Sequence, residues 1–239
     1  MAGSRPPKAL VFDVFGTVVD WRSSLIRDLG AWGAERGVAV DWAALADAWR
    51  GAYQPSMQKV REGALPWTRL DDLHETELRR LVEQFGLEGL SDDDIRYLNH
   101  VWHRLAPWPD AVAGLTRLKQ RFIIATLSNG NVALLANMAK RAGLPWDLIF
   151  SAELCRRYKP DPLTYRMTFE LLDLQPAEVM MVAAHNGDLI AAAEQGLRTA
   201  FVRRATEYGP RQRQDLEPEP GFDYAAESIE ELADQLGAG

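Results

Sequence analysis

Cysteine and long apolar runs are scarce in this chain, and each shortage excludes a class of protein. The one cysteine, Cys155, has no partner for an internal disulfide, which agrees with a reducing compartment, and we expect it to pack rather than react. No apolar run reaches the ~18–20 residues that span a bilayer. The N-terminal stretch from Met1 to Pro7 also lacks the apolar segment of a signal peptide. We therefore expect a cytoplasmic protein with no membrane partner.

Positive charge is also in short supply. Lys and Arg number 27 against 34 Asp and Glu, which gives a formal net charge of −7. Nucleic-acid binding rests on a basic surface that faces phosphates, so this balance predicts no nucleic-acid partner. A local basic cluster, Arg203, Arg204, Arg211 and Arg213, is interpreted as a solvated loop. Apolar residues, at 47% of the chain, are in contrast ample for a packed core.

Short apolar runs alternate with stretches of helical periodicity. This alternation predicts an α/β fold with a Rossmann-like parallel sheet. In such sheets ligands bind at the carboxyl ends of the strands. Asp13, Ser128 and Asp188 each follow a predicted strand, so we expect them to meet at one edge. The predicted strands are Ala9–Phe12, Phe122–Thr126, Leu148–Ser151, Val179–Ala183 and Thr199–Val202.

The first two predicted strands are separated by far more chain than a crossover helix needs. The intervening pattern is helical, which predicts an inserted helical cap over residues 19–105 and an α/β core made of residues 1–18 and 106–239. Val19-Asp20 and the Pro-rich segment Ala106–Pro109 would form the hinge between them. Helices are predicted near Ser23–Arg36, Trp42–Arg61, Thr68–Phe85 and Asp92–Leu105.

Asp13 is the candidate nucleophile, because it is a lone carboxylate where an apolar strand gives way to the turn Val14-Phe15-Gly16-Thr17. A carboxylate can displace a leaving group from carbon and form an ester that water then cleaves. The alternative is a helix N-cap, a common role for Asp at such turns. Phe15 stands where a phosphoryl-transfer enzyme built on this turn would keep a second Asp. We therefore predict no metal and no cofactor.

Other polar residues suit the same chemistry. Lys159, extended before Pro160, would keep Asp13 ionised through its charge, although a surface lysine is the alternative. Asp188 would position Lys159 or the hydrolytic water, unless it is only a helix cap. Thr17, Ser128 and Asn129 offer hydrogen-bond donors for a substrate carboxylate or an ester oxyanion, but such residues are also ordinary N-caps.

Four short motifs occur in order along nearly the whole chain, and together they resemble the haloacid dehalogenase superfamily. They are Phe12-Asp13-Val14-Phe15-Gly16-Thr17-Val18, Leu127-Ser128-Asn129-Gly130-Asn131, Tyr158-Lys159-Pro160-Asp161 and Val182-Ala183-Ala184-His185-Asn186-Gly187-Asp188. Phe15 in the first motif resembles the type II (S)-2-haloacid dehalogenases. The resemblance implies a hydrolase that converts short (S)-2-haloalkanoic acids, or haloacetates, to 2-hydroxy acids with inversion. It also allows a homodimer.

The resemblance assigns further roles. Arg50, on a predicted cap helix, would accept the halide, helped by Asn129, and a guanidinium suits a leaving anion. Without the resemblance, Arg50 would be interpreted as a solvated helix residue. For Tyr165, packing against a core helix is an equal alternative to a role in the site. The implied substrate-binding residues are Val14, Phe15, Arg50, Asn129, Tyr165 and Asn186, to which Trp67 is added as a large aromatic near the expected pocket.

The last motif departs from the family pattern, in which Ser-Ser-Asn is common. Here Ala183-Ala184-His185 replaces two hydroxyls and adds an imidazole, which would orient or deprotonate the hydrolytic water. A buried neutral histidine bonded to backbone is the alternative. Gly187, where the family often has an aromatic, would change the pocket wall. A Mg²⁺-dependent phosphatase and a non-catalytic carboxylate-binding protein stay open as alternative functions, because fold does not fix function.

Overall fold

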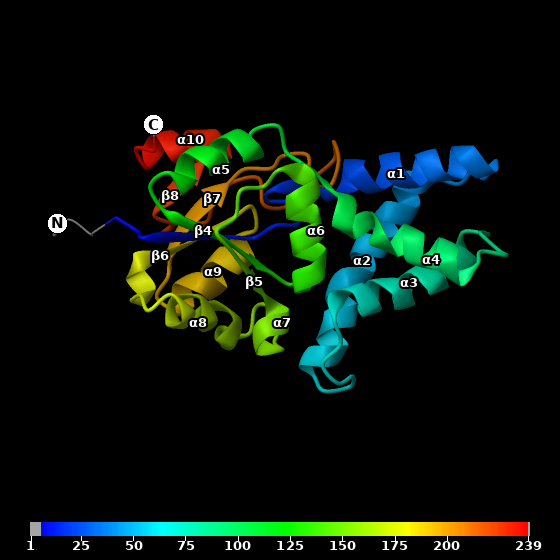
Figure 1. Ribbon diagram of the computed structural model, residues 1–239, viewed down its shortest axis with the longest axis horizontal. Coiled ribbons are helices and arrows are strands. Elements are labelled where there is room, and N and C mark those ends of the chain that lie inside the picture. Colours follow the sequence, from blue (N-terminus) through cyan, green and yellow to red (C-terminus); the bar gives the residue numbers. More distant parts are fainter. Residues whose placement is uncertain (1–5, 239) are drawn as a thin grey trace.

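A six-stranded parallel sheet forms the centre of the computed structural model, which describes residues 6–238 (Figure 1). The strand order is β5-β4-β1-β6-β7-β8, so β1, which leads into Asp13, lies in the middle. All five strands predicted from the sequence are present, and the α/β fold class is confirmed. The strands are β1 Ala9–Phe12, β4 Ile123–Ser128, β5 Leu148–Ser151, β6 Val179–Ala183, β7 Arg198–Val202 and β8 Tyr224–Ala226.

Helices cover both faces of the sheet, which explains why the strands are apolar throughout. Leu10 and Phe12 of β1 pack into one hydrophobic cluster, with α5 Ala111–Lys119, α6 Val132–Ala142 and α10 Ile229–Gln235. Ala9 and Val11 face the opposite cluster, which includes residues of α8 Pro162–Leu171 and α9 Asn186–Glu194. Between β5 and α8 lies the short α7 Ala152–Cys155, and η2 Pro176–Glu178 precedes β6.

The segment between β1 and β4 is largely helical and lies beyond one end of the sheet (Figure 1). It contains α1 Trp21–Arg36, α2 Trp42–Arg61, α3 Leu70–Gln84, α4 Asp92–Asn99 and η1 His100–Arg104. Capping side chains mark the starts of three of its helices. The side chains of Asp20 and Asp41 accept hydrogen bonds from the first turns of α1 and α2, and Ser91 and Asp94 form a capping box on α4.

Two very short strands join this helical segment to the sheet. β2 Val19–Asp20 pairs antiparallel with β3 Ala106–Pro107, so the chain leaves and returns at one place. These are the two segments that the sequence predicted as a hinge pair. The division into a core of residues 1–18 and 106–239 and a cap of residues 19–105 stays a prediction.

Three local differences from the predicted elements have simple causes. β8 was not expected, because a strand of three residues carries too little periodicity to recognise. The third cap helix begins at Leu70 rather than Thr68, since Arg69 has extended backbone angles. The fourth ends at Asn99 and continues as η1, so the predicted helix to Leu105 is too long.

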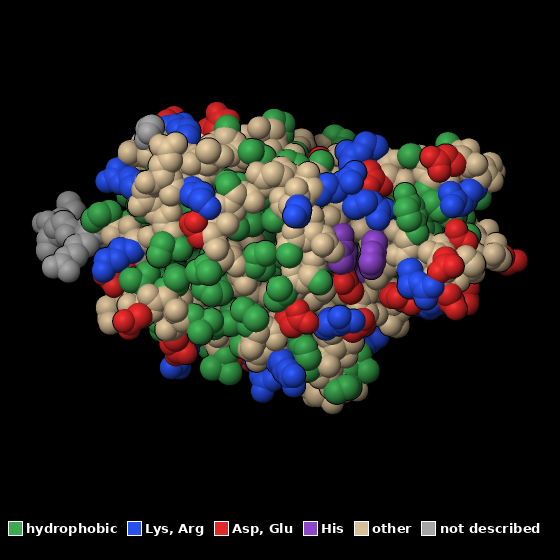
Figure 2. Space-filling model, in the orientation of Figure 1, with side chains coloured by type: hydrophobic (Ala, Val, Ile, Leu, Met, Phe, Trp, Pro, Cys, Tyr) green, Lys and Arg blue, Asp and Glu red, His purple; other side chains and the backbone are tan. Residues whose placement is uncertain are grey.

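Apolar side chains are exposed on the side of the core built by β5, α7 and α8, whereas charged side chains are prominent over the helical segment (Figure 2). The exposed apolar residues there are Leu148, Leu154, Leu163 and Leu171. The homodimer stays a prediction. Within residues 6–238, no helix is both long and apolar enough to cross a membrane. The expectation that residues 1–7 form no signal peptide concerns in part residues 1–5, which lie outside the described residues.

Candidate active site

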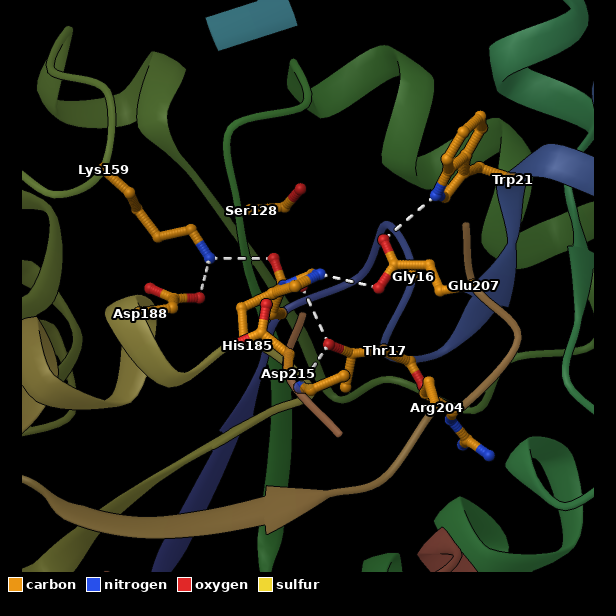
Figure 3. A network of polar contacts seen from close by, with 12 residues as sticks. Gly16, Thr17, Trp21, Ser128, Lys159, His185, Asp188, Arg204, Glu207 and Asp215 are labelled. Atoms are coloured by element: carbon orange, nitrogen blue, oxygen red, sulfur yellow. Dashed lines mark hydrogen bonds and ion pairs between the residues drawn. The ribbon is translucent and has the colours of Figure 1, made fainter. Parts of the chain in front are cut away.

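The turns that follow β1, β4 and β6 bring distant polar residues together at the carboxyl edge of the sheet (Figure 3). Asp13 follows β1 directly, and its backbone N–H donates to Val182 O of β6 at 3.0 Å. Asn129 follows β4, and Asp188 lies in the first turn of α9, after β6. The prediction that three separated motifs meet at one edge is confirmed for these positions, with Ser128 as the last residue of β4.

Asp13 is 7% exposed and accepts hydrogen bonds on both carboxylate oxygens. Lys159 Nζ donates to Oδ1 at 2.9 Å, and Thr17 Oγ1 donates to Oδ2 at 2.8 Å. The Thr17 hydroxyl in turn accepts the backbone N–H of Ala184 at 2.9 Å. Thr17 therefore links the β1 turn to the β6 turn and fixes the orientation of the Asp13 carboxylate.

Lys159 lies between two carboxylates. Its Nζ is 2.5 Å from Asp188 Oδ2, and Tyr165 donates its hydroxyl to Asp188 Oδ1 at 2.6 Å. The Lys159 backbone N–H donates to Asn129 Oδ1 at 2.8 Å, which fixes the backbone from which the side chain extends. Lys159 is thus buried and paired, unlike the surface lysine that was the alternative.

The charges around Asp13 favour its ionised form. Burial alone would raise the pKa of the Asp13 carboxyl, but the charge of Lys159 and the contact with His185 outweigh it and hold the pKa well below its usual range. Burial would likewise lower the pKa of the Lys159 ammonium, yet Asp13 and Asp188 raise it. At neutral pH the pair is a buried carboxylate and a buried ammonium.

His185 joins this group from the other side. Its Nδ1 is 3.2 Å from Asp13 Oδ2, and its Nε2 is 2.9 Å from Glu207 Oε2 (Figure 3). Burial would lower the pKa of the imidazole, but Glu207 and Asp13 raise it well above its ordinary value. His185 therefore contacts two carboxylates rather than backbone, and its role toward the hydrolytic water stays a prediction.

Arg50 extends from α2 toward the same place. Its guanidinium lies over the ring of Tyr53 at 4.3 Å, and Nη2 is 3.8 Å from Glu207 Oε1. Among the described residues, Nη1 is buried and has no hydrogen-bond partner. Burial opposes the charge, but neighbouring Tyr208, Tyr53 and Glu207 raise the pKa of Arg50. A permanent cation with a buried, unused donor is suited to hold an anion.

A cavity of about 480 Å³ connects these side chains. It holds most of the predicted residues together, because Asp13, Phe15, Arg50, Asn129, Lys159, Tyr165, His185 and Asp188 all line it. Phe15 packs edge-on against Tyr53 and Trp102, so an aromatic wall stands beside the Asp13 carboxylate. The site thus combines an ionised carboxylate, a cation with a free donor, and an apolar wall.

Four predicted residues besides Trp67 do not line this cavity. Val14 is buried in the core, and Thr17 reaches the site only through its bond to Asp13. Ser128 Oγ accepts the backbone N–H of Gly130 and shapes the turn after β4. Asn186 bonds the backbone of residues 217 and 219 and so holds the loop after β7. Thr17 thus contacts the Asp13 carboxylate directly, whereas Val14, Ser128 and Asn186 do not face the cavity.

Trp67 is also misplaced by the prediction. It packs on Tyr158, with ring centroids 4.8 Å apart, and lines a separate groove of about 730 Å³. That groove is larger than the Asp13 cavity but contains neither Asp13 nor His185, so we place the chemistry in the smaller cavity. Trp67 lies in the loop between α2 and α3, and no local pattern in the sequence indicates the direction of a loop side chain.

The loop between β7 and β8 supplies site residues that sequence reasoning missed. Glu207, Tyr208, Gln214 and Asp215 come from this loop, and all but Glu207 line the cavity. Glu207 is 1% exposed and bonds His185. No motif marks these positions in the sequence, and the local pattern there is only a cluster of arginines.

The interpretation of those arginines as a solvated loop is wrong for Arg204. It is 7% exposed, forms a paired contact with both oxygens of Asp110 at 2.8 and 2.9 Å, and donates from Nε to Thr17 O at 2.9 Å. The half-buried carboxylate of Asp110 compensates the charge. Arg204 therefore anchors the loop to the turn that carries the Asp13 and Thr17 side chains.

Among residues 6–238, no group of three or more His, Cys, Asp or Glu side chains is arranged to hold a metal ion. The position two residues after Asp13 is filled by the buried ring of Phe15. The charge opposite Asp13 is supplied by Lys159.

The parallel sheet and the buried polar cluster at its carboxyl edge define an enzyme of the α/β class. Residues 7–196 match the family model of the haloacid dehalogenase-like hydrolases. The chain belongs to this family and is a hydrolase.

Curated relatives and solved structures agree. (S)-2-haloacid dehalogenase 4A of Burkholderia cepacia is 31% identical over 206 residues, which cover 82% of this chain and 83% of the relative. The crystal structure of the L-2-haloacid dehalogenase PA0810 is 48% identical, with a TM-score of 0.94, covering 98% of this chain and 100% of that one. That of the defluorinating L-2-haloacid dehalogenase Rha0230 is 45% identical, also with a TM-score of 0.94, covering 98% and 96%.

Proposed function

We propose that this hydrolase replaces halogen by hydroxyl on short (S)-2-haloalkanoic acids, and on haloacetates, with inversion at C2 and through an ester on Asp13. The observation that carries the proposal is that ionised Asp13 and the Arg50 guanidinium, with its buried and unused Nη1, line the same cavity. The names of the similar proteins support the same substrate class.

In the first step, a lone pair of Asp13 Oδ1 attacks C2, and the carbon–halogen bond breaks with its electron pair on the halide. Oδ1 is the favoured nucleophile because Oδ2 is held by Thr17 and His185, whereas Oδ1 has Lys159 alone. A fixed carboxylate beside the carbon makes the displacement effectively unimolecular.

The halide leaves toward Arg50 and Asn129, both of which line the cavity. The unused Nη1–H of Arg50 stabilises the negative charge as it develops on the leaving atom. We assign the substrate carboxylate to donors of the loop after β4, which reaches the cavity through Asn129. Residues 19–105, the proposed cap, contribute Arg50 and thus one wall of the site.

In the second step, water attacks Cγ of the Asp13 ester and the product leaves with the former Oδ1. Lys159 and Asp188 support this step, because their contact at 2.5 Å places a polar pair beside the ester. One proton of the water ends on the product hydroxyl, and the other is released to the medium with the halide. Asp13 is regenerated with one oxygen from water.

Two other functions were open from the sequence. A Mg²⁺-dependent phosphatase would need a second carboxylate beside Asp13, where Phe15 lies buried against Trp102. A carboxylate-binding protein without catalysis would not require an ionised Asp13 paired with Lys159. Neither is favoured by a specific observation.

The test is halide release from the separate (S) and (R) enantiomers of 2-chloropropionate with EDTA present, for the wild type and Asp13→Asn. Release from the (S) form alone, lost in the variant, is expected. Chloroacetate and fluoroacetate extend the test to haloacetates and to fluoride. Phosphomonoester hydrolysis that requires Mg²⁺, without halide release, would overturn the proposal.

A single turnover in ¹⁸O-water with excess enzyme tests the ester. The heavy oxygen should enter the Asp13 peptide, and the first product should carry ordinary oxygen. Label found only in the product would contradict the ester route, even if halide is released.

A further inference from the structure

His185 is flanked by two carboxylates in a way that fixes its charge. Nδ1 lies 3.2 Å from Asp13 Oδ2 and Nε2 lies 2.9 Å from Glu207 Oε2. An ionised carboxylate only accepts hydrogen bonds, so Nε2 donates to Glu207. Nδ1 faces Asp13 at ion-pair distance, where the carboxylate stabilises a proton on that nitrogen as well. A ring with a proton on both nitrogens is an imidazolium.

Glu207 is held in place from several directions. Its Oε1 accepts the indole N–H of Trp21 at 3.0 Å, and the residue is 1% exposed. The turn that carries Asp13 is shaped around it, because a Cβ on Gly16 would lie 2.1 Å from Glu207 Oε1. Gly16 also has a φ of +88°, which L side chains rarely adopt. Two independent constraints therefore keep residue 16 a glycine and leave room for the carboxylate.

We propose that Glu207 is a positioning residue that holds His185 as an imidazolium, and that the Nδ1–H of His185, together with the Thr17 hydroxyl, forms the oxyanion hole for hydrolysis of the Asp13 ester. This proposal rests on the proposed function. It assigns His185 an electrophilic role in place of water deprotonation.

The geometry follows from which oxygen attacks. If Asp13 Oδ1 becomes the ester oxygen, Oδ2 becomes the carbonyl oxygen, and Oδ2 is the atom that faces both Thr17 Oγ1 and His185 Nδ1. Attack of water on Cγ moves the C=O π pair onto Oδ2. The resulting oxyanion then has a neutral donor and a cationic donor already in place.

The intermediate collapses when the pair on Oδ2 re-forms the carbonyl and the Cγ–Oδ1 bond breaks. The electron pair leaves on Oδ1, which takes a proton originating from the attacking water and departs as the product hydroxyl. The Asp13 carboxyl then releases its remaining proton to the medium. His185 keeps its proton throughout, so no further reactant is required.

The surrounding charges are consistent with this arrangement. Asp13 and Glu207 contact His185 directly; the other charged groups that line the cavity are Lys159, Asp188, Arg50 and Asp215. When Asp13 becomes a neutral ester, His185 loses one of its two anionic partners. Glu207 is then its remaining direct anionic partner, which is why its removal should affect hydrolysis more than alkylation.

The charge of His185 can be measured without any substrate. The chain has four histidines, so ¹⁵N-histidine labelling gives few signals, and His185→Asn identifies those of residue 185. At pH 8 we expect both ring nitrogens of His185 to be protonated in the wild type, and the ring to be neutral in Glu207→Gln. A neutral His185 in the wild type would overturn the proposal.

The role in hydrolysis is tested by quenched single turnovers with (S)-2-chloropropionate and mass spectrometry of the Asp13 peptide. In Glu207→Gln, we expect hydrolysis of the ester to slow by about tenfold or more, so that ester accumulates, while halide release in the first turnover changes less. The loss of hydrolysis at alkaline pH should begin at lower pH than in the wild type.

Glu217→Gln is the matched control, because it removes an exposed carboxylate from the same loop. It should leave the His185 signals, the ester level and the pH profile as in the wild type. Equal slowing of halide release and hydrolysis in Glu207→Gln would instead make Glu207 a general structural residue and refute the proposal. Absence of any halide release by the wild type would refute the proposed function, whereas the charge of His185 would still be decided by the spectrum.

Discussion

Acid should destabilise this protein through His74, a buried residue of α3. The ring is 2% exposed and stacks on Trp102, with centroids 4.3 Å apart. Among the described residues, neither ring nitrogen has a hydrogen-bond partner. Burial lowers the pKa of His74 to about 3; Asp71 opposes this, and Arg50 adds to it. The folded protein therefore keeps the ring neutral at pH values where an exposed histidine is charged.

The sign and size of the effect follow from proton linkage. The reference pKa is 6.5, so between pH 6.5 and about 3 the unfolded chain binds a proton at His74 that the folded chain does not. The free energy of unfolding must fall as pH is lowered through this window. The loss is about 2 kcal/mol at pH 5 and approaches about 5 kcal/mol below pH 3, from ~1.4 kcal/mol per pH unit.

His74→Phe removes this titration and keeps an aromatic ring against Trp102. We expect urea unfolding at pH 7.5 and pH 5 to show that the variant gains about 2 kcal/mol over the wild type on acidification. His100→Phe, at an exposed position, is the control and should show a smaller gain. A stability difference between His74→Phe and the wild type that is the same at both pH values would refute the reasoning.

Three further predictions concern the buried charges. Lys159→Met leaves Asp13 buried without its cation. The variant should therefore lose halide release, and its free energy of unfolding at pH 7, measured by urea titration, should fall by about 3–5 kcal/mol. Unchanged stability would contradict this prediction. Arg50→Lys keeps the charge but not the planar donors, so kcat/KM should fall by about tenfold or more in halide-release assays, and wild-type activity would exclude the assigned role. Arg204→Ala breaks the paired contact with Asp110, so the free energy of unfolding measured by chemical denaturation should fall by about 3 kcal/mol. No loss of stability would mean that Arg204 is merely solvated.

Much of the fold was predictable because its signals are local. Apolar runs such as Ala9–Phe12 and Val179–Ala183 are buried on both faces of a parallel sheet, and they read as strands without knowledge of their partners. Asp20 and Asp41 mark helix starts by a hydrogen bond within one turn. β8 and the end of α4 were missed because short strands and 3₁₀ turns carry weak periodicity.

The sequence by itself determined the parallel sheet, the inserted helices, and the placement of Asp13, Lys159 and Asp188 near one edge, because strand ends and motif order are properties of neighbouring residues. Tertiary structure decided the rest. Glu207 and Arg204 pack near the turn that follows Asp13, although about 190 residues separate them from it in the sequence. A contact between such distant segments produces no periodic pattern in the sequence of either one. Trp67 lies outside the cavity because it belongs to the loop between α2 and α3, and the direction in which a loop side chain points is set by tertiary packing.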